Sequence, residues 1–339
     1  MSPPTAFQKR MFDSPFTFRK EIFMYKNILP AYIQLERKAG LREDETFKIV
    51  PKFYGSRLAL KFDAEFDDDA VILLENLKAR GYYTGKRDTG YDLEHSMVAI
   101  RAMARFHALG IAMKNKNPEL FEIFKRHSKC MNLNSHDCAD VHELILKKIE
   151  KDVVMNPYYE RCKKLLITAD PAAAWTAVPS EPWSTIVHMD FWVNNIMFHR
   201  RANGKIDDVK FLDFQNYLFL SPLRQLIFYL FSSVDESVKD NQLNKLICFY
   251  QQCLSDILIR MGCDATPYSK EKFDDQIPKD ANFEFVHLCI MLRVMTLDTK
   301  EANFNYNKIE SVMSDYEGSQ LFIERLRKVV LYFTKREWI

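Results

Sequence analysis

The stretch 186–215 constrains the fold of this chain most, because it carries the signal of a β-hairpin. An apolar triplet lies on either side of the dipeptide Asn203-Gly204: Ile196, Met197 and Phe198 before it, Val209, Phe211 and Leu212 after it. Asn-Gly accepts the positive φ angles of a tight hairpin turn. The sequence therefore predicts two antiparallel strands that turn at this dipeptide.

Two polar side chains are predicted to meet at the open end of this hairpin. Asn195 and Asp213 are equidistant from Gly204, and paired strands lie about 5 Å apart, so the two are placed to share a hard cation such as Mg²⁺. Asp190 precedes Asn195 by five positions. This D-x-x-x-x-N spacing, followed by an Asp at a strand end, matches a phosphoryl-transfer layout in which the first Asp handles the substrate hydroxyl and the other two residues hold metal.

Each of these residues also has a plainer interpretation. A single Asp after a strand is commonly a turn residue or a cap, and only the joint spacing favours a metal-nucleotide site. A metal phosphohydrolase built on His188-x-Asp190 is a further alternative. It needs more His and Asp ligands, and neither His136 nor His199 stands in such a motif.

Composition excludes several classes of protein. The 339 residues are enough for two lobes with substantial cores. The formal net charge of +2, with mixed signs, argues against binding of nucleic acid or membrane. Seven cysteines without a C-x-x-C pair indicate neither a disulfide framework nor a zinc site. Without a signal-peptide core or a long apolar run, we expect a reducing, cytoplasmic setting.

The N-terminal part reads as mixed helix and strand. Apolar spacing predicts a helix over 16–37, which Pro30 bends or restarts. Strands are predicted over 47–54 and 58–62, and the apolar run 70–74 is typical of a buried strand.

The later part of the chain reads as helical. The glycine-bearing stretch 81–90 is interpreted as a linker or lobe boundary, and Asp92 as the N-cap of a helix that continues through His107. Without an H-E-x-x-H motif, His107 is interpreted as a packed, hydrogen-bonded histidine. Helical periodicity recurs within 120–166, and further helices are predicted over 223–232, 242–261, 283–296 and 320–334.

These elements predict an α+β fold of two lobes with a cleft between them. The first lobe covers 1–74, and 75–339 forms the hinge and a larger helical lobe with the hairpin. We expect ATP at the junction, with its adenine against the backbone near Glu75, Asn76 and Leu77.

Five blocks of sequence resemble the insect ecdysteroid-kinase-like family, within the choline-kinase and aminoglycoside-phosphotransferase group. They are 18–30, 71–82, 92–109, 188–198 and 209–215. The resemblance implies a protein-kinase-like fold and ATP-dependent phosphorylation of a hydroxyl on a small-molecule alcohol, such as a steroid.

The resemblance also implies residue roles. Asp190 looks like the catalytic Asp that orients the substrate hydroxyl and accepts its proton. Asn195 and Asp213 look like the Mg²⁺ ligands, and His188 like a residue that orients the loop. Glu21, which by itself reads as a surface carboxylate, looks like the helix Glu that pairs with a phosphate-binding Lys.

The chain departs from the family pattern in three places. Met189 stands where the family has Gly, and Gln225 where an Asp normally braces the catalytic loop. No G-x-G loop and no strand Lys precede the first helix, and neither Lys9 nor Lys20 lies in the context of that Lys. We therefore expect a truncated first lobe without its phosphate clamp, and carry as the alternative a catalytically impaired, kinase-like binding protein.

Overall fold

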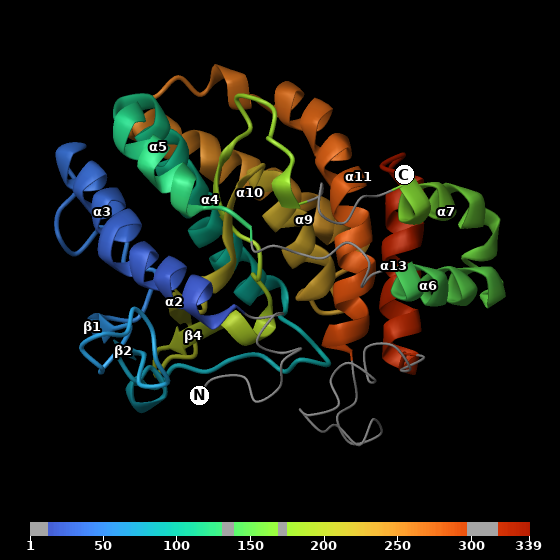
Figure 1. Ribbon diagram of the computed structural model, residues 1–339. Coiled ribbons are helices and arrows are strands. Elements are labelled where there is room, and N and C mark those ends of the chain that lie inside the picture. Colours follow the sequence, from blue (N-terminus) through green and yellow to red (C-terminus); the bar gives the residue numbers. More distant parts are fainter. Residues whose placement is uncertain (1–12, 131–138, 169–174, 297–317) are drawn as a thin grey trace.

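The computed structural model describes residues 13–130, 139–168, 175–296 and 318–339. The described part is mostly helical, with three two-stranded antiparallel sheets. In Figure 1, the N-terminal helices and the first sheet occupy one end of the molecule, and the helices α6, α7, α11 and α13 occupy the other. The α+β class is confirmed.

The first helical segment is confirmed and contains an irregular turn. It runs through α2 (Ser14–Phe23), η1 (Met24–Ile28) and α3 (Leu29–Lys38). Pro30 has no N–H for the carbonyl four residues earlier, and the turn before it widens into a π-helix in which the Leu29 N–H donates to the Met24 carbonyl. The predicted interruption at Pro30 is therefore this π turn, and Glu21 lies one turn before it.

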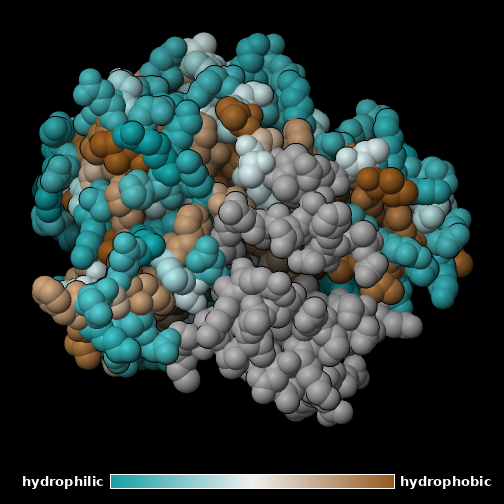
Figure 2. All heavy atoms as spheres, in the orientation of Figure 1, coloured by the Kyte–Doolittle hydropathy of each residue, from teal (hydrophilic) through white to brown (hydrophobic). Residues whose placement is uncertain are grey.

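The first sheet is smaller and more exposed than the sequence predicts. β1 (Phe53–Arg57) pairs with β2 (Val71–Leu74) alone. Val71 and Leu73 are 39% and 58% exposed, so the prediction of a buried strand is wrong: no further layer covers their side of the described sheet. Apolar atoms accordingly show on the surface at the lower left of Figure 2, where Figure 1 places these strands.

The strand predicted over 58–62 is also wrong. The backbone N–H groups of Leu60 and Lys61 donate to the Asp67 carboxylate, at 2.8 and 3.0 Å. These bonds hold the segment as part of the connection between β1 and β2. The strand predicted over 47–54 is present only from Phe53, although the Ile49 carbonyl accepts a hydrogen bond from the Phe211 N–H at 2.7 Å.

The predicted hairpin is present, with a different turn. β4 (Ile196–Arg200) pairs with β5 (Ile206–Phe211) so that Ile196 lies opposite Phe211. Of the turn dipeptide only Gly204 has a positive φ, 83°, and its N–H donates to the Arg201 carbonyl at 2.8 Å. The connection is thus a type I turn that ends on a left-handed glycine, and not a two-residue turn with two positive φ angles.

A sheet that the sequence did not predict lies beside the hairpin. β3 (Thr185–His188) pairs with β6 (Tyr217–Leu220), and His188 lies opposite Tyr217. The chain therefore leaves β3 where it enters β6, and the Met189 N–H donates to the Asn216 carbonyl at 3.0 Å. This pairing brings the loop that contains Asp190 next to the segment that follows Asp213.

The helices form most of the core. Asp92 caps α4 (Leu93–Lys116) as predicted, and α4 packs against α10 (Asp240–Arg260). The remaining α-helices are α5 (Pro118–His127), α6 (Ala139–Lys151), α7 (Tyr159–Thr168), α9 (Pro222–Ser232), α11 (Lys270–Met295) and α13 (Gln320–Lys335). α11 begins earlier than predicted, because it runs through Pro278. Within the described residues, no helix is both long and apolar enough to span a bilayer.

The segment between β2 and α4 is attached to the hairpin. Tyr83 exchanges two backbone hydrogen bonds with Phe198 of β4, at 2.9 and 2.8 Å. The stretch interpreted as a linker therefore lies against the hairpin. The boundary between 74 and 75 stays a prediction.

Candidate active site

The structure brings Asp190 and Asn195 into direct contact. Asp190 follows β3, and Asn195 ends the 3-10 turn η5 (Val193–Asn195). The Asn195 Nδ2 atom donates to the carboxylate and to the backbone carbonyl of Asp190, both at 2.8 Å. Because both bonds use the amide nitrogen, the Asn195 side-chain oxygen is left to accept from a donor or to bind a cation.

Asp213 lies one residue beyond the end of the hairpin pairing. The Leu212 N–H donates to the Asn195 carbonyl at 2.9 Å, so the ladder continues to Leu212. Asp213 then adopts a left-handed conformation, with φ and ψ both 61°, before the 3-10 turn η6 (Phe214–Asn216). Non-glycine residues rarely adopt this conformation, and it occurs preferentially at functional sites.

The charge of Asp213 acts on Asp190. Burial first, and then the negative charge of Asp213, raise the pKa of Asp190 to about 7. Burial also raises the pKa of Asp213. Two partly buried carboxylates that repel each other in this way are costly when both are ionised, unless a cation lies between them.

Glu21 joins the same group from α2, which packs against η6. Burial, and then the charge of Asp213, raise the pKa of Glu21 to about 7. The Tyr25 hydroxyl donates to Glu21 at 3.1 Å, a contact one helical turn along that the i, i+4 spacing could have revealed. In the part of the chain that the structure describes, no Lys, Arg or His forms an ion pair with Glu21.

Lys20 is not that partner, although it precedes Glu21. Its ammonium group donates to the backbone carbonyls of Tyr217 and Lys129, at 2.7 and 2.8 Å. Lys20 is buried there, and burial lowers its pKa to about 7. Lys9 lies outside the described residues.

His188 links the two loops of the site. Its Nε2–H donates to the Leu212 carbonyl at 2.8 Å, and its Nδ1 atom accepts from the Asp190 N–H at 3.3 Å. Burial lowers the pKa of His188 to about 4, so the ring is neutral at pH 7. These contacts suit a residue that orients the Asp190 loop.

Gln225 holds the same loop from behind. Its Oε1 atom accepts from the His188 N–H at 2.7 Å and from the His107 Nε2–H at 2.8 Å. The other ring nitrogen of His107 accepts from the Tyr250 hydroxyl at 2.8 Å, and burial lowers the pKa of His107 to about 3. The prediction of a packed, hydrogen-bonded His107 is confirmed. Gln225 thus braces the loop through its carbonyl oxygen.

We expect Gln225→Ala to lower the free energy of unfolding by about 2–4 kcal/mol, since it leaves two buried donors unsatisfied. Urea denaturation measures the change. Gln252→Ala, on the exposed side of α10, is the matched control and should stay within about 0.5 kcal/mol of wild type. Equal stabilities of the two variants would show that Gln225 does not brace the loop.

Met189 fits the backbone at the position where the resemblance leads us to expect glycine. Its φ is not positive, and its buried side chain packs with Val187, Leu218 and Leu220 of the β3–β6 sheet. The backbone therefore does not require glycine at this position.

The three residues predicted to border the adenine are described by their local contacts. Leu77 is buried, Glu75 forms an ion pair with Arg80 at 2.7 Å, and the Asn76 side chain accepts from the Ala79 N–H at 3.3 Å. No hydrogen bond recorded among the described residues joins Glu75, Asn76 or Leu77 to Asp190. Their contact with adenine stays a prediction.

The donor set suits Mg²⁺ better than zinc. Searched over the described ranges, the chain holds no group of three or more His, Cys, Asp and Glu side chains arranged to bind a metal ion, which gives no support to the phosphohydrolase alternative. An Asn oxygen and an Asp carboxylate are the hard ligands that Mg²⁺ uses when phosphate oxygens and water complete its shell. Asn195 and Asp213 would hold the ion.

The model of the ecdysteroid kinase-like family matches residues 1–263. The chain belongs to this family. Family membership supports a kinase-like phosphotransferase of small molecules. Among solved structures, an ethanolamine kinase from Plasmodium vivax matches at a TM-score of 0.38 and 12% identity, over 90% of this chain and 71% of that chain. No curated protein matches.

Proposed function

We propose that this member of the ecdysteroid kinase-like family transfers the γ-phosphoryl group of ATP to a hydroxyl of a small molecule, with Mg²⁺. One observation carries the proposal: Asn195 bonds Asp190 directly, and the charge of Asp213 acts on both Asp190 and Glu21. Because the family description names ecdysteroids, a steroid alcohol is the first acceptor to test.

Each residue has a role in this reaction. The acceptor oxygen attacks the γ-phosphorus, the bond to the bridging oxygen of ADP breaks, and Asp190 accepts the hydroxyl proton. Asn195 fixes the Asp190 carboxylate, and His188 and Gln225 fix the loop behind it. When bound, Mg²⁺ neutralises the charge on the phosphates. Asn195 and Asp213 supply its protein ligands, and Glu75, Asn76 and Leu77 border the adenine.

A second function, binding without transfer, is favoured by the surroundings of Glu21. In the described residues its carboxylate contacts the Tyr25 hydroxyl and no cation. A site in which no Lys neutralises the phosphates would transfer slowly and would still bind nucleotide through the metal and the hinge.

Calorimetry with Mg-ATP, run beside a transfer assay on a panel of alcohols that includes steroids, separates the two functions. We expect nucleotide binding, and transfer that stops when EDTA removes the metal. Binding without transfer to any alcohol would favour the non-catalytic function, and the absence of both would contradict the metal-nucleotide site itself.

A further inference from the structure

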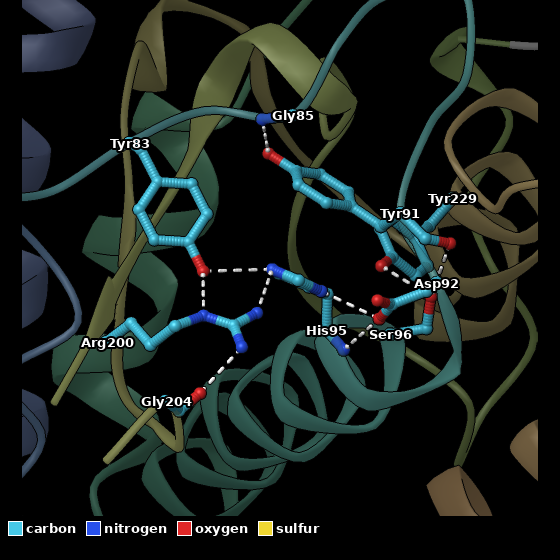
Figure 3. A network of polar contacts seen from close by, with 9 residues as sticks. All are labelled: Tyr83, Gly85, Tyr91, Asp92, His95, Ser96, Arg200, Gly204 and Tyr229. Carbon is cyan, nitrogen blue, oxygen red and sulfur yellow. Dashed lines mark hydrogen bonds and ion pairs between the residues drawn. The ribbon is translucent and has the colours of Figure 1, made fainter. Parts of the chain in front are cut away.

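The Tyr91 side chain reaches the backbone of the loop that carries Asn195. Its hydroxyl lies 2.9 Å from the Ile196 carbonyl and 3.1 Å from the Val193 carbonyl, so its proton is shared between two acceptors that flank Asn195 in the chain. The same oxygen accepts from the Gly85 N–H at 2.9 Å. Figure 3 shows the ring of Tyr91 directed at Gly85.

The backbone of Tyr91 is anchored to the end of α9. Its N–H donates to the Ser233 carbonyl, and its carbonyl accepts from the Asp235 N–H, both at 2.8 Å. The Ser233 hydroxyl in turn accepts from the Val193 N–H at 3.1 Å. Val193 is therefore held on its N–H by Ser233 and on its carbonyl by Tyr91, both of which belong to one hydrogen-bonded unit.

The side chains and backbone packed around Tyr91 fix the position of its ring. The ring is 2% exposed and packs edge-on against Phe198, with centroids 4.9 Å apart. A Cβ atom at Gly85 would lie 2.6 Å from a carbon of the Tyr91 ring, closer than real side chains approach. Only glycine at position 85 lets the hydroxyl and the Gly85 N–H meet. Burial also raises the pKa of Tyr91, so the hydroxyl keeps its proton as a donor.

We propose that Tyr91 is a positioning residue of the phosphotransfer site, which ties the segment after the hinge, at Gly85, to the backbone on both sides of Asn195. The inference rests on the proposed function, in which Asn195 is a metal ligand. A buried tyrosine that only fills space needs one polar partner for its hydroxyl. Here all three partners are backbone groups, two of them on the metal-binding loop. Through Tyr91, the conformation of that loop depends on the position of Gly85, in the segment that follows the residues predicted to contact adenine.

Tyr91→Phe tests this inference, because it removes the hydroxyl and keeps the ring. Tyr229→Phe is the matched control: Tyr229 is fully buried in the same network, but its hydroxyl bonds only Ser96 among these residues, at 3.2 Å (Figure 3). The probes are Mn²⁺ binding in the presence of ATP, followed by electron paramagnetic resonance, and hydrogen exchange of the amides of 193–196.

We expect Tyr91→Phe to weaken Mn²⁺ binding about fivefold to tenfold, the factor for one lost hydrogen bond. Exchange at 193–196 should quicken by a similar factor, and kcat should fall while the KM for the acceptor stays unchanged. Tyr229→Phe should match wild type in all of these, although both variants lose some thermal stability. Gly85→Ala should act like Tyr91→Phe, since the added methyl group displaces the ring.

The outcomes separate this inference from the proposed function. If Tyr91→Phe binds Mn²⁺ as wild type does and exchanges no faster at 193–196, the positioning role is wrong while the function stands. If wild type itself neither binds Mn²⁺ nor transfers phosphate, the proposed function fails. In that case, amide exchange at 193–196 alone decides whether Tyr91 orders the loop. Equal exchange rates there in Tyr91→Phe and Tyr229→Phe would show that it does not.

Discussion

Asp190→Asn should lower kcat for phosphoryl transfer by about 10²- to 10⁴-fold, the contribution of a general base, while Mg-ATP binding stays close to wild type. The asparagine keeps the shape of the side chain and an oxygen for the Asn195 amide, which donates to this group at 2.8 Å. It loses the ability to take up the hydroxyl proton. Initial rates at saturating Mg-ATP, beside calorimetry of nucleotide binding, measure the two effects separately.

Asp207→Asn is the control for Asp190→Asn. Asp207 lies on the exposed side of β5 and pairs with His199 and Arg201 at the far end of the hairpin. The same change of carboxylate to amide there should leave kcat within about twofold, as expected for a surface residue away from the reacting atoms. Should Asp190→Asn retain the kcat of wild type, Asp190 does not accept the proton.

The hairpin could be predicted because its signals are local. Two apolar triplets and Asn203-Gly204 specify antiparallel strands. The pairing places Asn195 beside Leu212, the residue before Asp213. The kind of turn was not predictable from the dipeptide. The five-residue connection 201–205 has a positive φ only at Gly204, whereas a two-residue type I′ turn needs two.

The burial of a strand and the pairing of distant strands could not be predicted from the sequence, because both depend on segments far away in the chain. The run 70–74 has the composition of a buried strand, but its burial depends on what packs over the sheet, and in the described structure only β1 pairs with it. β6 is four residues long, too short to show a period, and it is a strand because β3 lies beside it.

Some residues of the candidate site could likewise be predicted from local spacing, and others could not. The spacing of Asp190, Asn195 and Asp213 pointed to one site without knowledge of the fold. Glu21 needed the family resemblance, because a helical carboxylate looks alike whether it faces solvent or Asp213. The two hydrogen bonds that Gln225 accepts could not be foreseen, since they join three segments of the chain.

Asp213→Asn should stabilise the metal-free protein above about pH 7 and abolish its stabilisation by Mg-ATP. The pKa values of Asp190 and Glu21 are raised to about 7 in the folded protein, and Asp213 is a cause of both shifts after burial. The folded protein therefore holds more protons than the unfolded chain between about pH 4 and 7, so these groups cost stability as pH rises through that window. Removing the Asp213 charge should recover about 1–2 kcal/mol above it, at 1.4 kcal/mol for each pKa unit.

Urea denaturation at pH 4 and pH 8, in EDTA and in Mg-ATP, tests this reversal. At pH 4 the difference between variant and wild type should shrink, since the carboxyls are then largely protonated in the folded protein. Asp207→Asn should instead lower the free energy of unfolding at pH 8, because the hydrogen bond from His199 lowers the pKa of Asp207, so its charge stabilises the fold.

In Mg-ATP, wild type should become more stable than Asp213→Asn, because a ligand that binds only the folded protein adds to its stability and the variant lacks one metal ligand. A variant less stable than wild type in EDTA at pH 8 would mean that Asp213 is not repelled by its neighbours, and would remove the electrostatic argument for a cation at this site.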